Sequence, residues 1–132
     1  MRRIFHYALA AMILHHGANF VIDLLNPTAQ EMFGPRSVQG KPAREAFPEI
    51  ETQGMFEFLD RVYATGEPHQ AVEMRVLFDR NGGGVPEETF WDVTLQPLND
   101  PGEPTTDILS HAVEVTAQVH ARRKLEERDD AS

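Results

Sequence analysis

The sequence predicts one α+β domain in which helices cover one face of a five-stranded antiparallel sheet. The chain has 132 residues, of which 41% are hydrophobic and 25% charged, which suits a single packed core of ordinary size. Two strand-like segments stand near its beginning and three in its second half, with helical patterns between them. This order is typical of an antiparallel sheet that carries its helices on one side.

The first 25 residues indicate a flanking helix and a strand hairpin. Apolar residues recur at three and four positions in residues 1–11, which is helical spacing. Residues 12–25 are apolar and β-branched with one break near Gly17, so we expect two short strands joined by a tight turn. The apolar run from Tyr7 to Leu14 is short and two histidines follow it, so we expect no cleaved secretory leader.

Helices should fill the middle of the chain. Asn26 is a favoured N-cap, which predicts a short helix that ends at Phe33. Residues 35–51 hold glycine and prolines among charges and should form loop and single helical turns. The clearest helix follows, because apolar side chains recur at helical spacing from Met55 to Tyr63 before Gly66 ends the pattern.

A hairpin of two strands comes next. Apolar residues occupy every second position from residue 72 to residue 78, which predicts a strand with one buried face. This face should be formed by Val72, Met74, Val76 and Phe78. Three glycines at 82–84 should form the hairpin tip. The return strand alternates in the same way around Trp91, Val93 and Leu95, and we expect Pro97 to end it.

The end of the chain predicts a central strand and an exit helix. Residues 107–115 are mostly apolar, as expected for a strand covered on both faces. The residues after Thr116 are good helix formers without a breaker, but their apolar stripe is thin, so this helix should lean on the domain, on a second copy or on a downstream segment. We therefore expect a flanking helix at 1–11, a domain at 12–116 and a linker helix at 117–132.

Composition excludes several classes of function. The formal net charge of −9 has the wrong sign for binding nucleic acid. The absence of cysteine excludes disulfides, thiolate nucleophiles and sulfur-ligated metals, and it suits the cytoplasm. No segment approaches the roughly 20 apolar residues that span a bilayer, so we expect no membrane insertion.

The motifs in this order resemble those of a PAS domain. The resemblance covers roughly residues 10–125 and depends on several short motifs rather than on one. They are LLNPTA at 24–29, FG at 33–34, VQGK at 38–41, YATGEP at 63–68 and VEVT at 113–116. In the last motif, Glu114 stands where the family usually carries aspartate, which leaves the short-range pairing of this position open.

This resemblance implies a non-catalytic sensory and dimerisation module of bacterial signalling proteins. It implies a homodimer and a kinase-like effector, encoded on the same polypeptide or a separate one. It also implies that Glu114 and Thr116 relay the signal into the exit helix. A small-molecule cavity between the long helix and the sheet would be lined by Phe56, Leu59, Tyr63, Met74, Val76, Trp91, Val93 and His111. Such a stripe of residues is more often plain core packing, which stabilises the fold without any ligand.

The identity of a cofactor is unknown from the sequence. The family includes haem and flavin sensors, but no histidine lies between Gln53 and Tyr63, where the haem ligand is common, so we do not expect haem. Covalent flavin chemistry is excluded because it needs a cysteine, whereas non-covalent flavin stays open. His15 and His16 should point to opposite faces of a strand and cannot share a metal ion, so we predict no metal site. His111 lies in an apolar strand, where its ring needs a partner or a ligand.

Two other functions remain open. A ligand-free interaction module with a completely packed core would have the same sequence pattern. A small acid–base enzyme that uses Asp23 or His111 is the third hypothesis, although the sequence offers neither residue an oriented partner.

Overall fold

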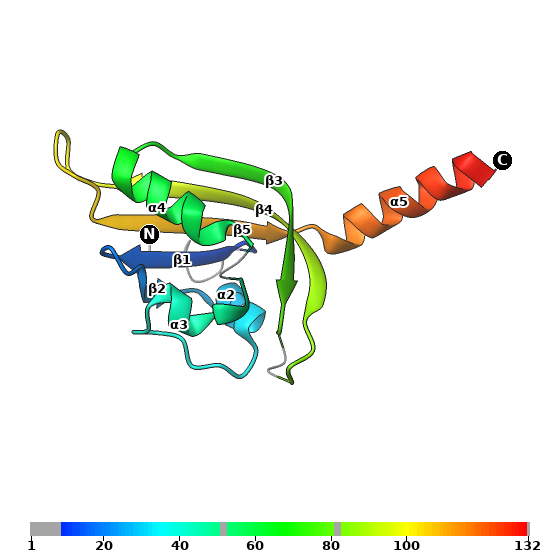
Figure 1. Cartoon of the computed structure of the whole chain (residues 1–132), viewed down its shortest axis with the longest axis horizontal. Coiled ribbons are helices and arrows are strands. Elements are labelled where there is room, and N and C mark those ends of the chain that lie inside the picture. The colour runs from blue at the N-terminus through cyan, green and yellow to red at the C-terminus, as the bar shows by residue number, and fades with distance from the viewer. Residues whose placement is uncertain (1–8, 51–52, 81–82, 132) are drawn as a thin grey trace.

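The computed structural model describes residues 9–50, 53–80 and 83–131, and its sheet has five antiparallel strands (Figure 1). The strands are β1 (Ala11–His16), β2 (Val21–Leu25), β3 (His69–Phe78), β4 (Glu87–Leu98) and β5 (Asp107–Glu114). Their spatial order is β2-β1-β5-β4-β3, so the hairpin formed by the first two strands joins the later three through β1 and β5. The expected α+β class and antiparallel sheet are confirmed.

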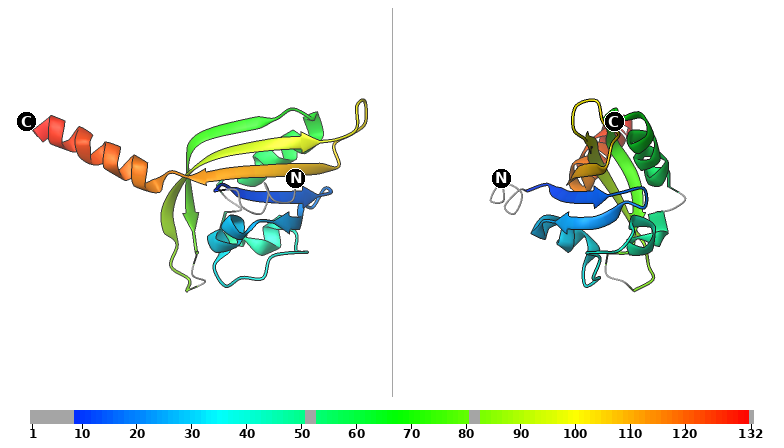
Figure 2. Two further views of the ribbon diagram at one scale, coloured as in Figure 1. Left: turned by 180° about the vertical axis from the view of Figure 1, so that it is seen from behind. Right: turned by 90° about the vertical axis from the view of Figure 1, so that its left-hand side faces the viewer.

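The helices lie together on one side of this sheet, apart from the last (Figures 1 and 2). They are α2 (Pro27–Phe33), α3 (Ala43–Ala46), the 3₁₀ turn η1 (Pro48–Ile50), α4 (Met55–Thr65) and α5 (Thr116–Ala131). Helix α5 follows β5 directly and projects away from the body of the domain (Figure 1). The flanking helix expected at 1–11 falls mostly outside the described residues, and Ala11 already belongs to β1.

Asn26 ties the start of α2 to β1, and the sequence predicted its capping role. Its Oδ1 accepts hydrogen bonds from the backbone N–H groups of Ala29 and Met12, each at 3.0 Å, and its Nδ2 donates to the Ala10 carbonyl at 2.9 Å. The side chain is buried, so these backbone groups have no water to replace it. One residue therefore orders both the helix and the strand beside it.

A bulge in β3 corrects the expected burial of Val72. The register between β3 and β4 shifts between Ala71 and Met74, and Glu73 adopts a φ of 51°. An extra residue in one strand reverses the alternation of its side chains. Val76 and Phe78 are buried as expected, whereas Val72 is 69% exposed.

Pro97 does not end β4, contrary to the sequence prediction. The last pair between β3 and β4 joins His69 to Leu95, so β3 has already ended beside Pro97. The Leu98 carbonyl accepts a hydrogen bond from the Thr106 backbone N–H on the side of β5. The backbone nitrogen of Pro97 therefore points to the opposite side, where β3 no longer runs. The missing N–H of proline therefore removes no sheet hydrogen bond.

The core lies between the helices and the inner face of the sheet. Its largest fully buried side chains include Phe20, Phe33, Phe56 and Leu59. Strand β5 buries Ile108 and Ser110 on this face and leaves His111 and Val113 exposed on the other. The expectation that β5 is covered on both faces is therefore wrong, since no helix among the described residues lies over its outer face (Figure 2).

Candidate functional site

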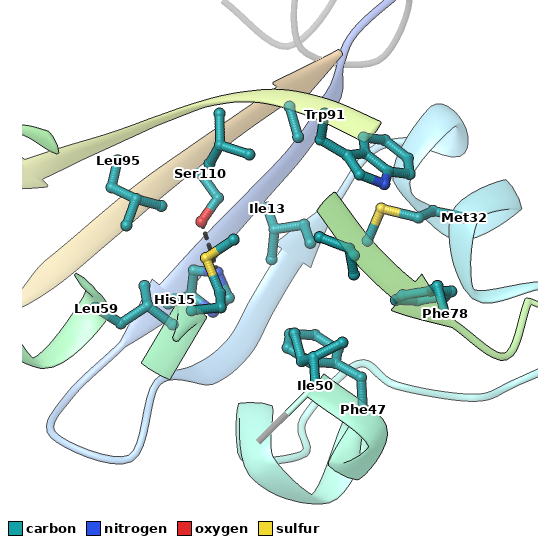
Figure 3. Close-up of a pocket in the computed structure, with 14 residues that line it drawn as sticks. Ile13, His15, Met32, Phe47, Ile50, Leu59, Phe78, Trp91, Leu95 and Ser110 are labelled. Atoms are coloured by element: carbon teal, nitrogen blue, oxygen red, sulfur yellow. Dashed lines mark hydrogen bonds between the residues drawn. The ribbon is translucent and has the colours of Figure 1, made fainter. Parts of the chain in front are cut away.

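A small cavity of about 70 Å³ lies in the core between the sheet and the helices (Figure 3). Its wall combines side chains from four strands with others from α2, η1, α4 and the residue that precedes η1. The lining residues are Ile13, His15, Met32, Phe47, Ile50, Met55, Leu59, Val76, Phe78, Trp91, Val93, Leu95, Ser110 and Ala112. Almost all of them are hydrocarbon or thioether side chains, so the site is suited to binding rather than to acid–base chemistry.

Four of the eight predicted cavity residues lie on this wall, namely Leu59, Val76, Trp91 and Val93. Phe56 is buried but stacks on Phe47, with ring centroids 5.9 Å apart. Tyr63 packs edge-on against Phe20, also at 5.9 Å, and Met74 is only partly buried beside the core. The ligand-binding role of the four wall residues stays a prediction.

The structure separates both proposed acid–base residues from the cavity. His111 is exposed on the outer face of the sheet, since its neighbours Ser110 and Ala112 are the β5 residues that point inward. Asp23 is exposed on β2. Neither side chain lines the cavity, so the structure gives the enzyme hypothesis no site there.

The buried histidine of the cavity is His15, which sequence reasoning did not select. His15 is 2% exposed, whereas His16 is exposed and pairs with Asp107 at 2.6 Å, so the two rings lie on opposite faces as expected. The signal that could have found it is the alternation in β1, because Ala11, Ile13 and His15 share one face.

Two hydrogen bonds determine which ring nitrogen of His15 carries the proton, and burial determines that the ring is neutral. Its Nδ1 lies 3.2 Å from the Phe20 carbonyl oxygen, which can only accept, so Nδ1 carries the proton. Its Nε2 lies 2.9 Å from the Ser110 hydroxyl and accepts from it (Figure 3). Burial lowers the pKa of His15 from 6.5 to about 4, and the Phe20 carbonyl opposes this shift only in part. The ring is therefore neutral at physiological pH.

The predicted relay residues form a joint where β5 meets α5. Thr116 Oγ1 donates to Glu114 Oε2 at 2.8 Å and accepts from the Phe90 backbone N–H at 3.0 Å. Glu114 Oε1 accepts from Arg80 at 2.9 Å. Glutamate therefore makes a short-range pair at this position, and the open question about its pairing is answered.

Helix α5 contacts the domain through its first turns. Val119 is 2% exposed, and both guanidinium nitrogens at the end of Arg122 donate to Glu73 at 2.7 Å. Arg123 lies over the Phe90 ring at 4.8 Å. Leu125 is 60% exposed, so this apolar side chain of the later turns is left largely unpacked.

The described part of the chain holds neither a cluster of metal ligands nor a membrane-spanning helix. No group of three histidine, aspartate or glutamate side chains gathers there to hold a metal ion. None of the helices in that part has the length and apolar character to cross a bilayer.

A model of the family described as the PAS fold matches residues 8–120, so this chain belongs to the PAS family. The expected family and the topology of the sheet agree with this match.

Solved structures support the same fold. The PAS domain of BvgS from Bordetella pertussis is 20% identical, with a TM-score of 0.67, and the match covers 100% of this chain and 96% of that one. A sensory box sensor histidine kinase from Vibrio cholerae is 15% identical, with a TM-score of 0.62, over 87% and 85% of the two chains. An RNA-binding Light-Oxygen-Voltage receptor is 16% identical, with a TM-score of 0.72, over 98% of this chain but only 36% of the receptor. Identities this low show the fold alone.

Haem and flavin do not fit this cavity. A volume of about 70 Å³ is far below the roughly 300–1,000 Å³ of pockets that hold such ligands. Helix α4 carries no histidine, and both ring nitrogens of His15 are already hydrogen-bonded. The chain also lacks the cysteine that covalent flavin chemistry needs.

Proposed function

We propose that this chain is a sensory and dimerisation module of a bacterial signal-transduction protein. It binds a small molecule, or responds through packing, and passes the change to an effector through α5. The observation that carries this proposal is that the cavity wall and the exit joint share β5. Ser110 and Ala112 line the cavity, and Glu114 lies two residues further along the same strand. Trp91, also on the wall, is paired in register with Glu114.

This arrangement supports transmission over a short path. An occupant that moves Trp91 or Ala112 displaces the end of β5 and, with it, the carboxylate of Glu114. Thr116 bonds both Glu114 and the Phe90 backbone, so the first turn of α5 follows the ends of β4 and β5. Signalling then requires only that the ligand binds the domain with different affinity in two conformations of this joint.

A second copy of the chain and a kinase-like effector are the proposed partners, in the cytoplasm. Leu125, an apolar residue that is 60% exposed in the later turns of α5, supports pairing because a helix with so little packing is marginal alone. Light scattering of the whole chain should show a dimer that dissociates on dilution. Monomers at every concentration would contradict the dimerisation proposal.

Cavity filling tests the sensory proposal directly. Because the chain has no cysteine, the changes Gln96→Cys and Glu127→Cys allow spin labels on β4 and α5 alone. Val93→Trp puts an indole into the cavity and should shift the distance distribution between the labels, since overpacking moves neighbouring elements. The matched control Val113→Trp lies on the outer face of β5 and should leave the distribution unchanged. The same distribution for both variants would count against transmission through the cavity.

The ligand-free interaction module is the second candidate, and the small size of the cavity favours it. Native mass spectrometry of freshly purified protein separates the two functions. A stoichiometric retained molecule, absent from Val93→Trp, supports sensing. Consistent emptiness, together with no thermal shift by any metabolite of a screen, supports docking without a ligand.

A further inference from the structure

We infer, on the basis of the proposed sensory function, that this cavity takes a small, uncharged, hydrocarbon-like molecule and rejects ligands that carry a hydrogen-bond acceptor. The hydrogen-bond donors of the cavity wall, the charge of the wall and the volume of the cavity together select this class of ligand.

Every side-chain donor on the described wall is already used inside the protein. His15 donates its Nδ1 proton to the Phe20 carbonyl, and the Ser110 hydroxyl donates to His15 Nε2. The third donor, Trp91 Nε1, donates to Thr89 Oγ1 at 2.7 Å. A ketone or carboxylate oxygen that entered would leave water and find no donor in its place, which disfavours its binding.

The wall also lacks charge. None of its described residues is Asp, Glu, Lys or Arg, and the buried His15 stays neutral because its pKa is lowered to about 4. An ionised ligand would therefore lose its hydration without gaining a counter-ion. Water is a poor occupant too, because an ordered buried water needs two to four polar partners.

The volume limits the size of the guest. A cavity of about 150 Å³ with a Leu, Ile and Phe wall holds benzene or xenon, and this one has about half that volume. Met32, labelled in Figure 3, and Met55 are partly buried and line the cavity. Their flexible thioether chains can yield to a slightly larger guest. Molecules of a few carbon atoms therefore fit, and aromatic cofactors do not.

The test uses the whole chain and four probes: the small atom xenon, and three molecules that share a four-carbon skeleton, n-butane, 2-butanone and sodium butanoate. Methyl groups of Leu59 and Val93 are followed by NMR as each probe is titrated. Xenon and butane should give saturable shifts, with butanone at least tenfold weaker than butane and butanoate without saturable effect. Butanone or butanoate that binds as tightly as butane would overturn the inference, as would the absence of saturable shifts with xenon and butane.

Two substitutions of Val93 show that the guest sits in this cavity. Val93→Leu adds one methylene to the wall and should weaken butane binding at least fivefold, whereas the outer-face control Val113→Leu should not change it. Val93→Thr keeps the shape of the side chain but adds a hydroxyl donor. The ratio of the affinity for butane to the affinity for butanone should therefore fall by at least threefold. Equal affinities in all three variants would place the guest elsewhere and refute the assignment.

The two proposals fail separately. If butane binds in the cavity but leaves the distance between labels on β4 and α5 unchanged, sensing fails and the ligand class stands. If native mass spectrometry finds a retained polar or charged molecule in the cavity, sensing stands and the ligand class is refuted.

Discussion

The neutral His15 in the core makes the stability of the domain depend on pH, and the structure sets the size of this effect. The pKa of His15 is about 4 in the folded protein because burial penalises the charged ring, against 6.5 for an ordinary histidine. Above pH 6.5 the ring is neutral in both the folded and the unfolded chain, so the burial of His15 then lowers the free energy of unfolding by no protonation cost. As the pH falls from 6.5 to 4, the unfolded chain binds a proton that the folded chain does not, so the free energy of unfolding falls.

One pKa unit corresponds to about 1.4 kcal/mol, so the difference between 6.5 and about 4 amounts to roughly 3 kcal/mol. Roughly 2 kcal/mol of it should be lost between pH 7.5 and pH 5. Burial raises the pKa of Glu49, but the hydrogen bonds from Arg36 and from backbone groups outweigh it, so this pKa is also lowered. The Glu49 carboxylate contributes stability above pH 4.5 that is lost only at lower pH, so ending the measurement at pH 5 keeps this loss out of the comparison.

The assay is urea unfolding at a fixed protein concentration, followed by the fluorescence of Trp91, the single tryptophan of the chain. His15→Gln keeps an amide that can donate to Phe20 and accept from Ser110, but it does not titrate. Its free energy of unfolding should lack the fall of about 2 kcal/mol that the unmodified protein shows between pH 7.5 and pH 5. The matched control His111→Gln changes an exposed histidine and should keep that fall. If the difference between the unmodified protein and His15→Gln stays constant over this range, the neutral buried ring is refuted.

Three further changes test the supports of the fold and of the exit helix. Asn26→Ala should lower the free energy of unfolding in urea by roughly 3 kcal/mol, because it removes a helix cap and leaves the backbone groups of Met12 and Ala10 unpaired. The control Gln39→Ala on the surface should lower it by less than about 0.5 kcal/mol. Glu73→Gln breaks the pair with Arg122, so the label distances from β4 to α5 should broaden; an unchanged distribution would show that this pair does not orient the helix. Gly66→Ala, at a φ of 71°, should cost about 1 kcal/mol, and a neutral result would contradict the left-handed C-cap.

Much of the fold followed from local patterns. Alternating apolar residues predicted the strands, helical spacing predicted α4 from Met55, and Asn26 marked the start of α2. These signals are local because a cap or an amphipathic face is formed by residues a few positions apart. The exit joint was accessible only through the resemblance of the motif around Glu114 and Thr116.

The cavity could be predicted only in part. Alternation shows which residues of one strand share a face, but it does not show which face is turned inward, so His111 was selected in place of His15. The bulge at Glu73 inverted the burial of Val72 in the same way, because an inserted residue leaves no mark in the pattern.

The sequence by itself determined the elements, their order, the absence of cysteine and the net negative charge, and the last two limit the chemistry of the domain. Only the tertiary structure decided which side chains meet. The bond between His15 and Ser110 joins residues 95 positions apart, and the Arg122–Glu73 pair joins residues 49 apart. Such contacts depend on how elements far apart in the chain pair and pack, and no connecting turn fixes the register between β1 and β5.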